Sequence, residues 1–97
     1  MKNPIAELNK HFESRVRLGC MSVLAVNDWV EFSTLKDLLQ VSDGNLASHI
    51  KALEQHQYIE VQKQFIGKKP NTSYRISKKG KTAFDAHLKA LEGLIRN

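Results

Sequence analysis

The second half of the chain most constrains its fold, because a helical pattern there is followed directly by two extended runs. Ser42 can accept hydrogen bonds from the free N–H groups of a first helical turn. Leu46, Ile50 and Leu53 then recur at the spacing of one helical stripe. The pattern predicts a helix over about residues 42–56 that buries this stripe against a core.

The opposite face of this predicted helix carries short or polar side chains and one charge. Its members are Gly44, Asn45, Ser48, Lys51, Ala52 and Gln55. Such a face can approach another surface closely while donating and accepting hydrogen bonds, which suits the edge of a DNA major groove. We therefore interpret residues 42–56 as a candidate recognition helix.

Two extended runs follow, over residues 58–66 and 72–77, and both are rich in β-branched and aromatic side chains. Residues 67–71 between them contain Gly, Pro and Asn, so the segment 58–77 is typical of a hairpin. A polar-faced helix followed by a hairpin is the outline of a winged helix-turn-helix. The sequence thus predicts a mainly α fold with a small β-hairpin as its wing.

The positive charge of the chain is concentrated on this hairpin and on the residues that follow it. The chain has 15 Lys and Arg against 10 Asp and Glu, a net charge of +5. Between Val61 and Lys81 there is no acidic residue, but there are seven basic ones: Lys63, Lys68, Lys69, Arg75, Lys78, Lys79 and Lys81. A clustered basic surface of this kind is expected of a protein that binds the phosphate backbone.

The first part of the chain predicts two helices. Asn3 and Pro4 are a typical N-cap and first helical residue, which places a terminal helix over about residues 4–12. Ser14 is a second candidate cap. The helix that it opens runs through Val26 and is apolar around most of its circumference, so we expect it to be largely buried.

A short strand and a short helix complete the predicted helix-turn-helix. Residues 29–32 form an extended piece in which Val30 and Phe32 face inward. The short helix over residues 35–40 braces the recognition helix across the groove. It is expected to bury Leu35, Leu38 and Leu39.

The last helix is expected to need a partner surface. Ser77 can cap a helix over about residues 78–96 that is apolar along one whole side. We expect it and the helix over residues 4–12 to pack partly on each other and partly on a second chain. The predicted dimer interface contains Ile5, Leu8, Phe12, Phe84, Leu88, Leu91 and Ile95. A two-fold dimer would place two recognition helices in successive major grooves, about 34 Å apart, on an inverted repeat.

A family resemblance rests on four runs of the sequence. They are LASHIKALE (46–54), YIEV (58–61), FIGKKP (65–70) and YRISKKG (74–80). These runs resemble the compact winged-helix transcriptional regulators of the MarR/ArsR-like group, and the resemblance covers roughly residues 14–91. One departure is Gln57, because relatives commonly have Gly there in a left-handed conformation that ends the recognition helix.

The resemblance implies a homodimer bound to operator DNA. Asn45, Ser48 and Lys51 would then lie at or near the major groove. Lys68 and Lys69 would form the wing tip, near the backbone or the minor groove. The whole set of predicted DNA-binding residues is Ser42, Gly44, Asn45, Ser48, His49, Lys51, Lys63, Lys68, Lys69, Thr72 and Arg75.

Length and composition limit what else the chain can do. A chain of 97 residues predicts a single domain, and it has no apolar run long enough to span a membrane. The single Cys20 cannot form an internal disulfide, so a reduced cytoplasm is the expected setting, with this thiol buried as a small hydrophobe. The motifs of hydrolases and of phosphate-binding loops are absent, so we expect neither an enzyme nor a cofactor.

Two alternatives remain open besides a DNA-binding regulator. The fold could serve as a protein-interaction module, although a basic wing favours DNA. A small metal- or redox-responsive regulator is the other alternative, since His11, His87 and Cys20 could meet at a dimer interface. No zinc-ligand spacing occurs, and the paired cysteines of metal-sensing ArsR-type proteins are missing, so no metal site is predicted.

Overall fold

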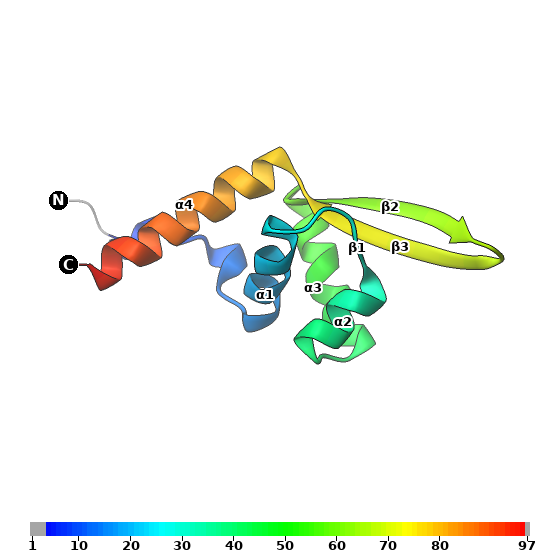
Figure 1. Cartoon of the computed structure of the whole chain (residues 1–97). Helices are drawn as coiled ribbons and strands as arrows, with labels where there is room; N and C mark the ends of the chain where they lie inside the picture. Colours follow the sequence, from blue (N-terminus) through cyan, green and yellow to red (C-terminus); the bar gives the residue numbers. More distant parts are fainter. Residues whose placement is uncertain (1–3, 97) are drawn as a thin grey trace.

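Four α-helices, a three-stranded antiparallel sheet and two 3₁₀ turns make up residues 4–96, which are those that the computed structural model describes. In chain order the elements are η1 (Pro4–Glu7), η2 (Lys10–Phe12), α1 (Arg15–Ala25), β1 (Val30–Glu31), α2 (Phe32–Leu39), α3 (Asp43–Gln55), β2 (Ile59–Ile66), β3 (Lys69–Ile76) and α4 (Lys78–Ile95) (Figure 1). The body is elongated, 57 × 25 × 21 Å, with the β2–β3 hairpin at one end and the last turns of α4 at the other. The predicted winged helix-turn-helix is confirmed.

The core forms around α1, against which α2, α3 and the sheet pack. Cys20, Met21 and Leu24 of α1 are buried, as the sequence predicted. The predicted stripe of three apolar residues on α3 is also buried, and it meets Leu35 of α2 in the same cluster. Burying each such side chain contributes about 1.5–3 kcal/mol, so these contacts fix α3 firmly to the body.

Serine caps open three of the four helices, as predicted. The Oγ atoms of Ser14, Ser42 and Ser77 each accept a hydrogen bond from the backbone N–H three residues further on. Each hydroxyl satisfies a donor that the helix itself leaves free. The start of α2 differs, because its N-cap Glu31 makes no side-chain cap bond.

Two apolar residues that were expected inside lie in solvent. Leu38 is 62% exposed. The buried face of α2 is the one that carries Leu35, and Leu38 lies at the edge of that face, toward solvent. The helix also starts at Phe32, three residues earlier than the predicted 35–40, so β1 is shorter than predicted. Val26 is 80% exposed, because α1 has ended and the chain turns away from the core.

The predicted terminal helix over residues 4–12 is wrong, because η1 and η2 are two separate 3₁₀ turns. Asn9 interrupts them with an extended backbone, and its side chain accepts a hydrogen bond from the N–H of His11. Asn side chains often compete in this way with helical hydrogen bonding. The predicted cap Asn3 lies outside the described residues.

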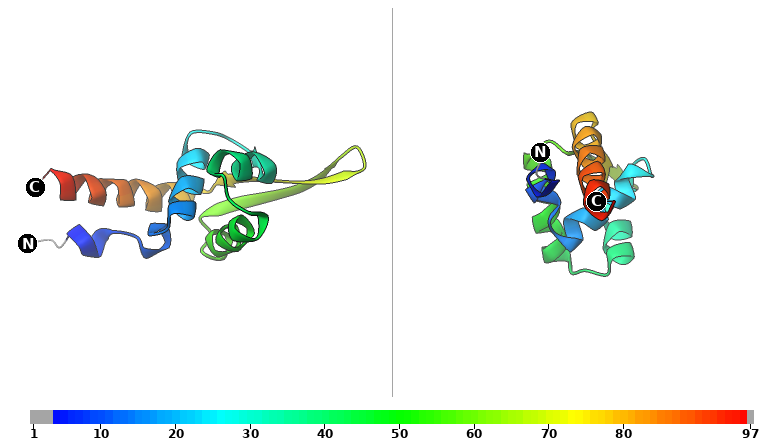
Figure 2. Two further views of the ribbon diagram at one scale, coloured as in Figure 1. Left: turned by 90° about the horizontal axis from the view of Figure 1, so that it is seen from below. Right: turned by 90° about the vertical axis from the view of Figure 1, so that its left-hand side faces the viewer.

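The sheet has the strand order β1-β3-β2. Gly67 and Lys68 alone connect β2 to β3, because Ile66 already pairs with Lys69. The loop is therefore shorter than the predicted one over residues 67–71, and Gly67 supplies the positive φ of 65° that a two-residue hairpin loop requires. The longer strands carry the hairpin well beyond the helices (Figure 2).

Candidate nucleic-acid interface

The helix-turn-helix consists of α2, a short turn and α3. Gln40 adopts a left-handed conformation, with φ of 53°, and thereby ends α2. An ion pair between Lys36 Nζ and Asp43 Oδ1, 2.9 Å apart, spans the turn. Asp43 lies in the first turn of α3, where a carboxylate also interacts favourably with the helix dipole. The turn thus sets α3 in one orientation relative to α2.

The polar face of α3 is open to solvent, as predicted. Ser42, Gly44, Asn45, Ser48, Lys51 and Gln55 are all exposed, and Ala52 is half-buried. Among residues 4–96, no side-chain hydrogen bond or ion pair engages Asn45, Ser48 or Lys51. The donors and acceptors of this face are therefore available for a partner.

His49, one of the predicted DNA-binding residues, lies half-buried at the edge of this polar face and is engaged within the chain, which argues against a direct DNA contact. Its Nδ1 accepts a hydrogen bond from Arg17 Nε of α1, 3.0 Å away. Burial, with the Arg17 charge as a second cause, lowers the pKa of His49 below its ordinary value of 6.5. A neutral imidazole held against α1 supplies no positive charge to a phosphate.

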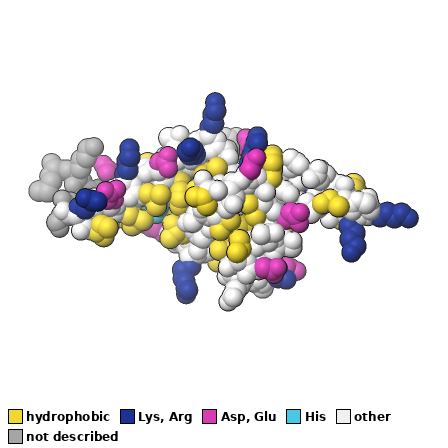
Figure 3. Space-filling model, viewed as in Figure 1, with side chains coloured by type: hydrophobic (Ala, Val, Ile, Leu, Met, Phe, Trp, Pro, Cys, Tyr) yellow, Lys and Arg dark blue, Asp and Glu magenta, His cyan; other side chains and the backbone are white. Residues whose placement is uncertain are grey.

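The end of the wing carries exposed lysines. Lys63, Lys68 and Lys69 are exposed, and Thr72 is half-buried opposite Lys63 on the neighbouring strand. Figure 3 shows Lys and Arg side chains at the far end of the hairpin, with no acidic side chain beside them on that face. None of the three lysines takes part in an ion pair within the described part of the chain. Their charge is free to meet a polyanion.

Arg75 belongs to the base of the wing, and its charge is compensated, which corrects the expectation of a free cation. Its Nε lies 2.6 Å from Glu60 Oε1 on the adjacent strand, and its Nη1 lies 3.9 Å from Asp28 Oδ1. The guanidinium also stacks over the ring of Trp29, 4.6 Å from its centroid. Arg75 therefore fastens the segment before β1 to the hairpin.

Two residues of the predicted dimer interface are instead core residues. Phe12 and Phe84 are buried, and their rings meet edge to face with centroids 5.5 Å apart. They connect η2 to α4 within one chain and are already buried in the monomer. The other predicted members remain accessible: Ile5, Leu88 and Ile95 are exposed, and Leu8 and Leu91 are half-buried.

Sequence reasoning missed a polar cluster that holds the N-terminal segment in place. The N–H of Asn9 donates to His87 Nδ1, 3.0 Å away, and its side-chain Nδ2 donates to Tyr58 Oη at 3.1 Å. His87 is buried, and this burial lowers its pKa below 6.5. The only signal of this cluster in the sequence was His87 on the apolar stripe of the last helix, and that pattern does not reveal its hydrogen-bond partner.

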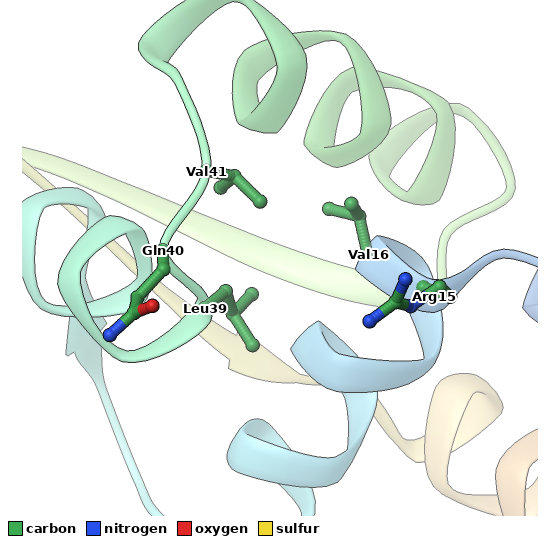
Figure 4. A pocket seen from close by; sticks show the side chains of 5 residues that line it. All are labelled: Arg15, Val16, Leu39, Gln40 and Val41. Carbon is green, nitrogen blue, oxygen red and sulfur yellow. The ribbon is translucent and has the colours of Figure 1, made fainter.

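Two hollows of about 350 Å³ each lie on the body. Arg15, Val16, Leu39, Gln40 and Val41 line the first, between the start of α1 and the turn of the helix-turn-helix (Figure 4). The second is lined by Leu8, Phe12, Glu13, Ser14, Arg15, Leu18, His87 and Leu91, where the N-terminal segment crosses α1 and α4. Neither contains a catalytic arrangement among its lining residues.

Cys20 is fully buried in the core, as predicted, and burial raises the pKa of its thiol to about 11. Cys20 therefore cannot meet His11 and His87 at an interface, which removes the ground for the metal- or redox-responsive alternative. Within residues 4–96 no three His, Cys, Asp or Glu side chains come together in a way that could hold a metal. No described helix is both long and apolar enough to cross a membrane.

Comparison with known proteins agrees with this geometry. The sequence model of the winged helix DNA-binding domain matches residues 16–95. An uncharacterised protein of Methanocaldococcus jannaschii is 34% identical over 88 residues, which cover 91% of this chain and 96% of that protein. The structure of a transcriptional regulator homologue protein from Pyrococcus horikoshii is similar over 96% of this chain and 94% of its own, with a TM-score of 0.86 and 29% identity.

The fold is also that of MarR. The MarR crystal structure superposes with a TM-score of 0.76 at 17% identity, over 90% of this chain and 63% of MarR. The resemblance drawn from the sequence is therefore confirmed at the level of the fold. Since the matching family is one of DNA-binding domains, the expectation that the chain is not an enzyme is confirmed as well. The chain belongs to the family of winged-helix DNA-binding domains.

Proposed function

We propose that this protein is a sequence-specific transcriptional regulator of the cytoplasm that binds operator DNA as a homodimer. The observation that carries the proposal is the division of α3 into a buried apolar face and an exposed, unengaged polar face. The exposed lysines of the wing lie beyond it, toward the hairpin tip. The similar protein from Pyrococcus horikoshii is described as a transcriptional regulator homologue, which supports the same function here.

In this proposal the two parts of the interface have different tasks. Asn45, Ser48 and Lys51 read base edges in the major groove, with Ser42 and Gly44 at the start of α3 close to the backbone. Lys63, Lys68, Lys69 and Thr72 of the wing contact the backbone or the minor groove. Arg75 acts indirectly, because its ion pairs hold the base of the wing.

Substitution of the polar face tests the first task. Asn45→Ala should relax base preference at one position by about 1–3 kcal/mol, as measured with DNA fragments selected from a random pool. Its melting temperature should change little, because Asn45 is exposed. The matched control is Leu53→Ala on the buried face, which should cost about 2–5 kcal/mol of stability. An Asn45→Ala protein with unaltered base preference would contradict the assignment of this face.

The dimer is proposed to form from the terminal segments. Ile5 of η1 and Leu88 and Ile95 of α4 leave apolar surface exposed on two elements that pack together away from the wing. Single exposed apolar side chains are common, but a cluster on two adjacent elements favours a partner surface. A second copy related by a two-fold axis would cover it and leave both α3 helices free to bind an inverted repeat.

Light scattering tests the dimer. The wild-type protein at micromolar concentration should have twice the monomer mass, and Leu88→Asp should shift it toward the monomer, because a carboxylate is costly to bury. DNA affinity should fall with it although no DNA-facing residue has changed. Leu38→Asp is the matched control, since Leu38 is an exposed leucine on α2. A wild-type protein that stays monomeric and binds one half-site as well as a palindrome would overturn the dimer.

The structure weighs against the redox alternative. A thiol at full burial with a raised pKa is a poor nucleophile, and Cys20 is the only cysteine of the chain. No observation of the described residues favours a protein-interaction module over DNA binding, and the charge of the wing favours DNA.

A further inference from the structure

The tip of the wing is apolar as well as basic. Phe65 is 74% exposed and Ile66 is 57% exposed, both at the end of β2. Pro70 pairs directly with Phe65 across the hairpin and is exposed too. Leaving a phenyl ring in water is unfavourable, and no residue of the described chain covers it. The feature therefore points to a partner that the free protein does not contain.

The alternation of the strand shows which face Phe65 shares. Side chains two residues apart lie on one face of a strand, so Phe65 lies on the same face as Lys63 and Ile59. Ile59 is buried in the core, on the side of the sheet where α1 and α3 pack. A duplex bound by α3 would meet this same side of the hairpin.

The reach of the wing matches the spacing of the grooves. From Val61, at the edge of the core, to Ile66 the strand advances about 17 Å at about 3.3 Å per residue. Half of the DNA helical repeat of about 34 Å, which separates a major groove from the next minor groove, is also about 17 Å. A wing that starts beside α3 thus ends at a neighbouring minor groove.

The minor groove is wide enough for side chains of the wing tip but too narrow for the whole hairpin. The minor groove of B-DNA is about 6 Å wide, while the two strands of a hairpin already lie about 4.8 Å apart without side chains. Only side chains at the tip can enter. Proteins that bind the minor groove often insert Phe, Leu, Ile, Met or Pro between base steps and kink the duplex.

Charge identifies DNA as the occupant of this surface. Lys63, Lys68 and Lys69 surround the apolar tip, and no Asp or Glu occurs between Val61 and Lys81. The lysines would bind the phosphates on either side of the groove while the ring contacts the bases. Pairing of β2 with a second copy is disfavoured, because Lys63 and Lys68 would repel their counterparts.

We propose that Phe65 is an apolar wedge that enters the minor groove beside the α3 site, unstacks one base step and bends the DNA. Pro70 supports the ring from the opposite strand, and Ile66 covers the sugar on the other face of the hairpin. This inference rests on the proposed DNA binding of the chain. The wedge would make binding depend on the shape and deformability of the DNA, in addition to the base edges that α3 contacts directly.

The experiment uses the full chain and a DNA duplex recovered by selection from a random pool. 2-Aminopurine replaces adenine at successive positions flanking the half-site, since its fluorescence rises when a neighbouring base unstacks. Wild-type protein should increase the fluorescence at one step on the wing side. Phe65→Ala should abolish the increase and weaken binding about tenfold, while Phe65→Leu should keep most of both. Val26→Ala, which removes a similarly exposed apolar side chain after α1, should change neither.

The salt dependence of binding separates this inference from the proposed function. Phe65→Ala should keep the wild-type slope of log K against log salt, because the lysines remain in place. Sequence-specific binding without any fluorescence change, and with equal affinity of Phe65→Ala, would overturn the wedge while leaving the proposed function intact. Absence of sequence-specific binding by the wild type would overturn both. Phe65-dependent binding to vesicles of an anionic phospholipid, with DNA affinity unaffected by Phe65→Ala, would assign the tip to a membrane surface and overturn the wedge.

Discussion

At the scale of single residues, His87 links stability to pH. Its Nδ1 accepts the N–H of Asn9, a bond that protonation of Nδ1 would break. Burial lowers the pKa of His87 below 6.5, so the unfolded chain binds more protons than the folded chain just below that pH. The contribution of this group to stability is therefore complete above about pH 6.5 and is lost as the pH falls through the lowered pKa.

Urea unfolding at pH 7.5 and at pH 5.5 measures this effect. The free energy of unfolding should be smaller at pH 5.5, and the difference should shrink in His87→Gln, whose side chain does not titrate. It should not vanish, because burial also lowers the pKa values of His11 and His49. Equal pH dependence in the variant and the wild type would show that His87 is not the group responsible.

Single residues also show where sequence reasoning worked. Ser42 and the apolar stripe on α3 were predictable, because caps and helical periodicity depend on neighbours within a few positions. Gln57 was identified as a non-Gly residue in a left-handed position, and its φ is 62°. Arg75 and His49 were misjudged, because their partners Glu60 and Arg17 lie 15 and 32 positions away. Local patterns carry no information on such pairings.

At the scale of elements, the start of α4 is fastened to residues 57 and 58, which join α3 to β2. The N–H of Ser77 donates to Tyr58 O at 3.0 Å, and its Oγ donates to Gln57 O at 2.7 Å. Gly80 makes this approach possible, because a Cβ there would lie 1.9 Å from Tyr58 O. The left-handed turn at Gln57 and the absent side chain at Gly80 together bring the start of α4 against the segment that joins α3 to β2.

Alanine substitution of two glycines of α4 tests this junction. Gly80→Ala should destabilise the protein by about 1–3 kcal/mol or more, because backbone cannot yield as a flexible side chain can. Gly93→Ala is the matched control on the same helix, where a Cβ meets nothing within 4 Å. It should stabilise the protein by up to about 1 kcal/mol through helix propensity. Thermal unfolding gives both values, and similar effects of the two substitutions would contradict the close packing.

Elements differ in how far the sequence predicts them. The α-helices and the hairpin were predicted because each has a cap, a period or a turn signal of its own. The N-terminal segment 4–12 has helical spacing of apolar residues but forms two 3₁₀ turns. Asn9 binds His87 of α4 and Tyr58, the residue before β2, and these tertiary contacts override the local preference. The polar face of α3 and the wing tip could be predicted from the sequence, because each depends on residues that are close together in the chain.

At the scale of the whole molecule, DNA binding and dimerisation are proposed for opposite ends of the body. The elongated body places the basic, apolar-tipped wing at one end and the exposed apolar residues of α4 at the other. Dimerisation at one end therefore does not compete with DNA contact at the other. For the wing to bind DNA in this arrangement, its lysines must contact DNA phosphates.

The salt dependence of DNA binding tests this contact between the wing lysines and the phosphates. Fluorescence anisotropy should give a slope of log K against log salt that becomes shallower by about 1–2 in Lys68→Ala with Lys69→Ala, since each neutralised phosphate contributes about 0.9. Lys10→Ala with Lys89→Ala removes two exposed lysines outside the wing, on η2 and on α4, and should leave the slope unchanged. A double wing variant with the wild-type slope would show that Lys68 and Lys69 contact no phosphate, and the wing would then not bind DNA as proposed.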